Sequence, residues 1–250
     1  MVEEPVVQTF NLTKRYRREV AVDSLNLSVE EGEIFGFLGP NGAGKTTTIL
    51  MLLGLSEPSG GWAHVCGLDS AREATKVKRL AGYLPENVGF YEDMNALQNL
   101  QFVAELNGIP KDKAAIKVQE AIEVVGLVDE DRKRLGAYSR GMKQRLGIAE
   151  VLIKDPKLVF LDEPTLGLDP DGANRMIELI SSLSRERRIT VFFSSHNLQQ
   201  VQRISDRVGI MIKGKLVAQG PISSLAQEKF GVDHEMYTLE EIYMKYFLEG

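Results

Sequence analysis

Residues 39–46 read Gly-Pro-Asn-Gly-Ala-Gly-Lys-Thr and match the phosphate-loop pattern G-x-x-x-x-G-K-[ST]. The apolar run at residues 33–38 is typical of a buried strand, and residues 45–54 form an apolar helical pattern. A glycine-rich connection between a buried strand and a helix is the context that this motif requires, so an ordinary glycine turn is a weak alternative. The sequence therefore predicts an α/β fold built around a P-loop NTPase core.

This loop predicts a site for a nucleotide with its magnesium ion. Glycines let the chain curl closely around phosphates, and the main-chain N–H groups of the loop and of the helix N-terminus point toward them. Lys45 adds a positive charge beside the β- and γ-phosphates, and Thr46 offers a hydroxyl oxygen to Mg²⁺. The predicted nucleotide-binding residues here are Gly39, Pro40, Asn41, Gly42, Ala43, Gly44, Lys45, Thr46 and Thr47.

A second candidate site lies where the apolar strand at residues 157–163 ends in Asp162 and Glu163. Adjacent residues of a strand point to opposite faces, so we expect the two carboxylates to have different roles. Asp162 is predicted to bind Mg²⁺, and Glu163 to orient or deprotonate a water aimed at the γ-phosphate. By itself Asp-Glu-Pro is as consistent with an ordinary turn, and the phosphate loop upstream makes the catalytic interpretation the better one.

Periodicity along the rest of the chain predicts one domain spanning residues 1–250. The N-terminal part is rich in strands and is expected to be antiparallel, whereas residues 95–152 show helical patterns and no strand. Alternating strands and helices return afterwards, which favours a mixed or parallel sheet. The expected parts are an α/β core at about residues 1–90 and 155–220, an inserted all-helical subdomain at about 91–154, and a helical tail at about 221–250. Predicted strands cover residues 6–10, 24–29, 33–38, 62–66, 80–84, 158–161, 190–193, 208–212 and 216–218, and a predicted helix covers 174–183.

Charge and composition narrow the function further. Lysine and arginine number 30 against 35 acidic residues, a formal net charge of −5, so no nucleic-acid partner is expected. The single cysteine, Cys66, cannot form an internal disulfide, and residues 1–8 have no basic leader pattern. No apolar run approaches the roughly 18–20 residues that span a bilayer. These features predict a cytoplasmic location.

Further motifs occur in the order found in the ATP-binding cassette (ABC) family, which the chain resembles from Tyr16 to His196. Residues 138–145 resemble the family signature LSGGQ-x-x-R and retain its serine and second glycine as Ser139 and Gly141. Residues 165–169 resemble the loop after the catalytic acid, which meets the partner subunit. The resemblance implies that Tyr16 stacks on adenine and that His196 contacts the γ-phosphate.

The chain departs from the family pattern at two places. Glu86 stands where the family usually has a glutamine that bridges Mg²⁺ and the attacking water. A carboxylate still ligates Mg²⁺, so Glu86 is predicted at both the nucleotide and the metal. In the signature, Arg140 replaces a glycine and Met142 the glutamine. Arg140 either adds a compensating positive charge or faces solvent, and the neighbouring basic residues favour solvent.

The resemblance also implies partners. Ser139 and Gly141 of one chain are expected to close over ATP held by another, in a head-to-tail dimer with a copy of itself or with a related ATPase subunit. The signature and the C-terminal residues resemble ATPase subunits of multidrug and antibiotic exporters. An integral-membrane permease would then bind near residues 86–91, placing the protein at the cytoplasmic face of a membrane. The alternative is an ATPase of a soluble assembly, such as iron–sulfur cluster building.

Some remaining residues receive structural interpretations. Trp62 is predicted in the core, and His64, His234 and Cys66 lack partners at metal-ligand spacing. An apolar stripe near the C-terminus is expected to pack on the chain's own core, with a dimer or permease contact as the alternative. The stripe consists of Leu239, Ile242, Tyr243, Tyr246 and Phe247.

Overall fold

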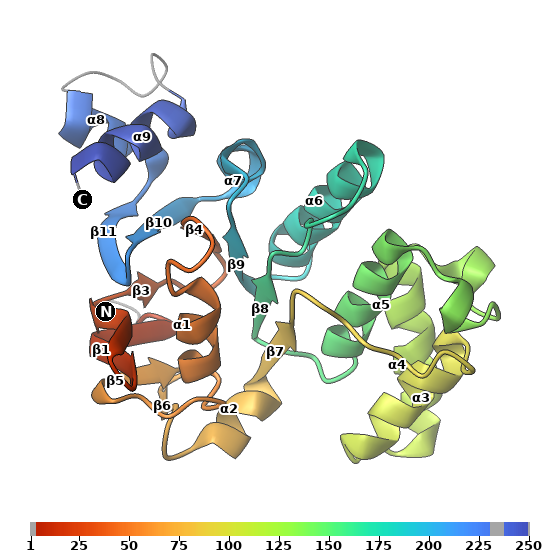
Figure 1. Cartoon of the computed structure of the whole chain (residues 1–250). Helices are drawn as coiled ribbons and strands as arrows, with labels where there is room; N and C mark the ends of the chain where they lie inside the picture. The colour runs from red at the N-terminus through yellow and green to blue at the C-terminus, as the bar shows by residue number, and fades with distance from the viewer. Residues whose placement is uncertain (1–3, 231–237, 250) are drawn as a thin grey trace.

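The computed structural model describes residues 4–230 and 238–249, and its central feature is a six-stranded sheet (Figure 1). The strand order is β11-β10-β4-β9-β8-β7, with β11 antiparallel to β10 and the other neighbours parallel. Short apolar runs that are buried along their length form these parallel strands. The bounds are β4 Ile34–Leu38, β7 Ala81–Leu84, β8 Leu158–Asp162, β9 Thr190–Ser195, β10 Arg207–Ile212 and β11 Lys215–Gly220.

A second sheet is antiparallel and has the order β2-β1-β5-β6, with β3 also paired to β1. Helix α1 (Lys45–Leu52) lies between the two sheets (Figure 1), and its Ile49, Met51 and Leu52 are fully or almost fully buried. They share one core cluster with Phe35 of β4 and with residues of the second sheet. The strands are β1 Val7–Tyr16, β2 Glu19–Leu25, β3 Ser28–Val29, β5 Gly60–Val65 and β6 Leu68–Asp69.

Three helices form the part of the chain on the far side of β7: α3 (Ala96–Leu106), α4 (Lys111–Val124) and α5 (Arg140–Leu152) (Figure 1). Asn95 and Gln98 begin α3 with a reciprocal capping box, and Ser139 caps α5 by accepting the Met142 N–H at 3.2 Å. All three helices fall within the predicted range 91–154.

The remaining helices connect strands or lie after β11. Helices α6 (Pro170–Arg185) and α7 (Leu198–Ile204) follow β8 and β9, and α2 (Ala74–Leu80) precedes β7. Helices α8 (Ile222–Phe230) and α9 (Leu239–Glu249) end the chain and pack on each other, with α9 also packed on α7. Among the helices of residues 4–230 and 238–249, none combines the length and the apolar character needed to cross a bilayer.

The predicted fold class is confirmed, but several local predictions were wrong. The strand predicted at residues 24–29 is interrupted: Ser24 and Leu25 are the last residues of β2, residues 26–27 lie in no strand, and β3 covers only Ser28–Val29. At this break the Asn26 side-chain amide donates to the main-chain oxygen of Ser24. Helices α2 and α7 were missed because each has only seven residues, too few for a periodic pattern.

Trp62 is not a core residue. On β5 the side chains of Ala63 and Val65 face the interior, so Trp62 points outward and is 36% exposed. Its ring lies between Phe10 and His64, with centroid distances of 5.9 and 4.6 Å. A solvent-facing aromatic row therefore replaces the expected core contact.

The C-terminal stripe packs on the chain's own core, as expected, through Leu239, Ile242 and Tyr246. Tyr243 is partly buried against the same core, whereas Phe247 is 43% exposed. Cys66 is partly buried, and burial raises the pKa of its thiol. His234 lies outside the described residues.

Candidate active site

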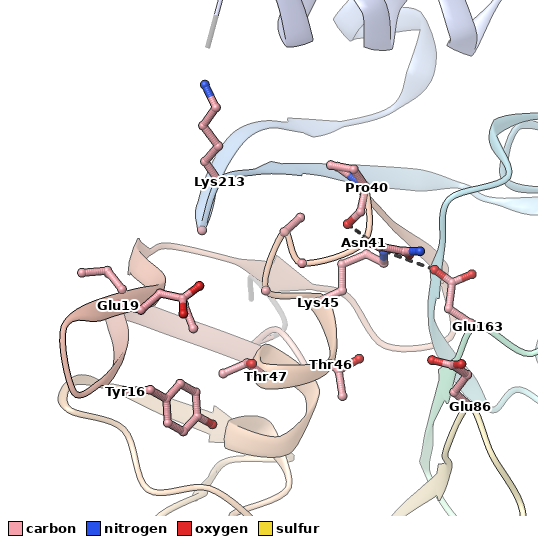
Figure 2. A pocket seen from close by; sticks show the side chains of 16 residues that line it. Tyr16, Glu19, Pro40, Asn41, Lys45, Thr46, Thr47, Glu86, Glu163 and Lys213 are labelled. Atoms are coloured by element: carbon pink, nitrogen blue, oxygen red, sulfur yellow. Dashed lines mark hydrogen bonds and ion pairs between the residues drawn. The ribbon is translucent and has the colours of Figure 1, made fainter.

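The phosphate loop lies at the carboxyl end of β4 and borders a cavity of about 630 Å³ (Figure 2). Gly42 and Gly44 have φ of +79° and +105°, which side chains rarely adopt. A Cβ on Gly44 would also lie 2.3 Å from the main-chain oxygen of Ala21, so only glycine fits there. The cavity is lined by Tyr16, Glu19, Val20, Ala21, Pro40, Asn41, Gly42, Ala43, Gly44, Lys45, Thr46, Thr47, Glu86, Glu163, Lys213 and Gly214.

Lys45, the first residue of α1, is buried and folds its side chain back over the loop. Its Nζ donates to the main-chain oxygen of Gly39 at 2.7 Å and to that of Pro40 at 3.3 Å. The same nitrogen lies 3.2 Å from Glu163 Oε1, an ion pair between two buried side chains. These contacts hold a positive charge at the mouth of the loop (Figure 2).

Asp162, the last residue of β8, is held by hydroxyl groups on two other elements. Thr46 Oγ1 donates to Asp162 Oδ2 at 2.7 Å, and Ser194 Oγ of β9 donates to Oδ1 at 2.5 Å. The carboxyl ends of β4, β8 and β9 meet at one edge of the sheet, so residues far apart in sequence gather there. A hydroxyl and a carboxylate are hard oxygen ligands of the kind that Mg²⁺ prefers, so the residues present fit this ion.

Glu163 directly follows the end of β8, and its carboxylate has different side-chain partners from that of Asp162. Its main chain has φ +48°, and its N–H donates to the Ser194 hydroxyl at 3.1 Å and to the Ser194 main-chain oxygen at 3.2 Å. Its carboxylate lies between Lys45 and His196, whose Nδ1 is 2.8 Å from Oε2. The structure therefore brings together Lys45, Thr46, Asp162, Glu163 and His196 in one connected network.

Tyr16 and Glu86 line the same cavity from opposite sides (Figure 2). The Tyr16 ring is 48% exposed, and the Lys14 ammonium lies 5.0 Å from its centroid. Glu86 follows β7, and its main-chain oxygen accepts a hydrogen bond from Gln144 Nε2 at 3.0 Å. Burial, with smaller contributions from Asp162 and Glu86, raises the pKa of the neighbouring Tyr83 to about 12, so this phenol stays protonated at neutral pH.

Ser139 and Gly141 do not border the cavity formed by their own chain. They lie at the start of α5, on the helical part. Arg140 is exposed, and its guanidinium lies against Gly167, where a Cβ would come within 2.7 Å of Nη1. Within the described chain, the signature residues therefore lie apart from the phosphate loop.

Sequence reasoning missed three contributors to the site. Ser194 holds both Asp162 and Glu163, and its one signal was a small polar residue at the end of an apolar strand. Glu19 and Lys213 line the cavity from a hairpin and a turn that carry no motif. Gly214, next to Lys213, donates its N–H to Ala43 of the loop at 3.0 Å.

Comparison with known proteins gives consistent matches. Residues 22–166 match a family model described as ABC transporter. The chain is 46% identical over 220 residues to the bacitracin transport ATP-binding protein BcrA of Bacillus licheniformis, covering 88% of this chain and 71% of that protein. It is 34% identical over 226 residues to the linearmycin resistance ATP-binding protein LnrL of Bacillus subtilis, covering 90% and 72%. A solved structure described as an ATP-binding subunit of an ABC transporter superimposes with a TM-score of 0.84 at 26% identity, covering 97% of this chain and 99% of that one.

Proposed function

The chain belongs to the ABC transporter family as an ATP-binding subunit that hydrolyses ATP, and from this premise we propose that it powers the export of an antibiotic through a membrane permease. This substrate class is supported by two relatives, one a bacitracin transport protein and the other a linearmycin resistance protein. Both matches extend over most of this chain. The same relatives favour a membrane partner over a soluble assembly partner.

Nucleotide binding is assigned to the phosphate loop and to Tyr16. The loop N–H groups and Lys45 receive the phosphates, and the exposed Tyr16 ring offers a face on which adenine stacks. When the phosphates bind the Lys45 ammonium, the ion pair between Lys45 and Glu163 must break. Binding thus frees the carboxylate that the reaction needs.

Thr46 and Asp162 would hold Mg²⁺, with Glu86 as a third oxygen ligand from the cavity wall. The ion supplies neutralisation of charge on the β- and γ-phosphates. Ser194 fixes the Asp162 carboxylate from the side away from Thr46.

Glu163 is the proposed catalytic base. Its carboxylate lies at the loop and accepts or orients a proton of the attacking water, while His196 holds its second oxygen at 2.8 Å. The left-handed main chain at Glu163 is a strained conformation, which structures retain where it aims a functional group. The single observation that carries the proposal is this Lys45–Glu163–His196 arrangement beside the Thr46–Asp162 pair.

Closure of the site is proposed to need a second subunit, either a copy of this chain or a related ATPase. Ser139 and Gly141 do not line the cavity of their own chain. They would instead cover the phosphates bound by the partner subunit. The Ser139-capped N-terminus of α5 presents main-chain N–H groups suited to phosphate. ATP would then join the two subunits, and hydrolysis would release them.

The subunit is proposed to work at the cytoplasmic face of the membrane, with the permease bound near residues 86–91. The test is purification of the tagged chain from detergent-solubilised membranes, followed by identification of what co-purifies and by transport assays in vesicles. A polytopic membrane protein and ATP-dependent antibiotic export are the expected results. Recovery with only water-soluble partners would reject this proposal while leaving the ATPase assignment intact.

A further inference from the structure

Gln144 is a buried amide on α5 with one half of its hydrogen-bonding capacity used. Its side chain is 1% exposed. The Nε2 atom donates to the main-chain oxygen of Glu86 at 3.0 Å, whereas Oε1 is buried and has no hydrogen-bond partner among the described residues. A buried acceptor without a partner destabilises a fold, so stability alone does not explain a glutamine here.

Close packing places α5 where Gln144 can reach Glu86. A Cβ on Gly147 would lie 2.4 Å from Leu84 Cδ1 and 3.1 Å from Val88 Cγ1, so the helix lies directly on β7 and on the segment that follows it. A Cβ on Gly82 would lie 2.1 Å from Val151 Cγ1, which shows the same closeness one turn further along the helix. Helix α5 is therefore packed tightly against β7 and the segment that carries Glu86.

Helix α5 connects the signature residues at its start to the Glu86 segment at the nucleotide cavity. Ser139 caps α5, and Gln144 lies about one and a half turns further along the same helix. Glu86, whose main chain Gln144 holds, lines the nucleotide cavity near Thr46 and Glu163 (Figure 2). A shift of α5 would therefore displace the Glu86 main chain, through the Gln144 hydrogen bond and through the packing of Gly147 against Leu84 and Val88. The Glu86 carboxylate would move with it.

We propose that Gln144 is a positioning residue for ATP hydrolysis: its amide fixes the Glu86 main chain, so that the placement of α5 sets where the Glu86 carboxylate lies in the cavity. This inference rests on the proposed function, because it concerns the same ATPase site. Gln144 does not itself reach the cavity. It acts through Glu86.

The test replaces Gln144 by Met, which keeps the length of the side chain and removes the hydrogen bond. The Gln144→Met chain is expected to melt no lower than the wild type, because the unpaired Oε1 is removed together with the bond. Its kcat is expected to fall about 10- to 100-fold, the scale of a small misplacement of a catalytic group, with little change in KM for ATP. The Mg²⁺ concentration that gives half-maximal activity is expected to rise.

A matched control makes the same chemical change on the same helical part. Gln119→Met lies on α4, where the amide only bonds Glu123 on the exposed surface, and kcat, KM and Mg²⁺ dependence are expected to stay at wild-type values. A second comparison repeats Gln144→Met in a Glu86→Ala chain. If Gln144 acts through Glu86, the substitution has little further effect there.

Three outcomes would overturn the inference: wild-type kinetics for Gln144→Met, an equal loss of kcat in the Glu86→Ala background, or a lower melting temperature for both Gln144→Met and Gln144→Leu. The last result would make Gln144 a structural residue. Failure of the proposed function looks different, because the wild-type chain would then hydrolyse ATP with normal Mg²⁺ dependence but would not co-purify with a membrane permease.

Discussion

At the scale of single residues, the site is organised by a few charged groups that satisfy one another. Lys45 is neutralised by Glu163, and Asp162 is held by the hydroxyls of Thr46 and Ser194. Each of these contacts lies where phosphate or a metal ion would compete for the same group. In the proposed mechanism, ligand binding would therefore exchange the partners of groups that are already in place.

Glu163→Gln tests the assigned base. The amide is isosteric and leaves the main-chain bonds to Ser194 in place, so ATP binding by calorimetry is expected to persist. Phosphate release is expected to fall by about 10² to 10⁴, the usual contribution of a positioned general base.

Asp171→Asn, an exposed acid at the start of α6, is the matched control and should hydrolyse ATP like the wild type. Unchanged hydrolysis by Glu163→Gln would reject the assignment.

At the scale of elements, the contact between α5 and β7 depends on two glycines. Gly147 of the helix and Gly82 of the strand each leave room for a side chain of the other element. The same helix carries a partly buried acid: Glu150 Oε1 accepts from Asn99 Nδ2 of α3, and Asn99 is 3% exposed. Close packing thus joins the helical part to the core, and the Asn99–Glu150 hydrogen bond joins two helices within the helical part.

Gly82→Ala is expected to lower the free energy of unfolding by about 1–3 kcal/mol, the usual cost of overpacking a core. The added methyl would meet Val151 Cγ1 at 2.1 Å, so one of the two elements must shift. Chemical denaturation measures the loss.

Val151→Ala in the same chain removes the colliding methyl. The double variant should therefore lose less stability than the two single variants together. Additive losses would show that the strain lies elsewhere.

Glu150→Gln tests the partly buried carboxyl through the pH dependence of stability. Burial raises the pKa of Glu150 above its ordinary value of 4.5, so the folded state binds its proton more tightly than the unfolded state. The wild type therefore loses stability as the pH rises from about 4.5 through the raised pKa, because the ionised carboxylate is penalised only when folded.

The glutamine has no such ionisation and keeps an oxygen for Asn99. The stability of Glu150→Gln relative to the wild type should rise over this pH window and then level off, as measured by urea denaturation at a series of pH values. A difference that stays constant with pH would contradict the assigned shift.

At the scale of the whole molecule, the nucleotide cavity and the signature residues lie on different parts of one chain. The cavity is bounded by the sheets and the phosphate loop, whereas Ser139 and Gly141 lie on the helical part beyond β7 (Figure 1). In the proposed head-to-tail pair, a complete site would combine the loop of one subunit with the signature of another.

Mixing two inactive variants tests this arrangement. Lys45→Ala removes the phosphate-binding charge, and Gly141→Asp adds a carboxylate at a position where the nearest atom to a new Cβ is 3.7 Å away, so the chain itself accommodates it. If two copies pair head to tail, a mixed dimer contains one intact site, and the mixture should hydrolyse ATP although neither variant does.

The control is a chain with both substitutions mixed with the wild type, because no mixed dimer of these chains has an intact site. Wild-type pairs in this control stay active, so its hydrolysis should fall below that of the same amount of wild type alone, whereas the first mixture should gain a hydrolysis that neither variant has by itself. Absence of recovery would show that the partner is not a copy of this chain.

The motifs predicted from sequence were those whose chemistry needs a fixed local pattern. The phosphate loop and the Asp162–Glu163 pair follow from residue types at short spacing, and the parallel strands follow from continuous apolar runs. Glu19 and Lys213 escaped prediction because they reach the cavity only through the pairing of distant elements. Trp62 was misplaced because a lone aromatic in a short strand does not reveal which face is buried.

The position of β4 between β9 and β10 has a consequence for biosynthesis. On the ribosome, the segment with the complete phosphate motif emerges long before either neighbouring strand has been translated. Until residue 195 is available, both hydrogen-bonding edges of β4 lack their native partners, and until residue 212 is available one edge still does. Open strand edges promote aggregation. Products of premature termination that retain the whole motif are therefore expected to need chaperones rather than to sequester nucleotide.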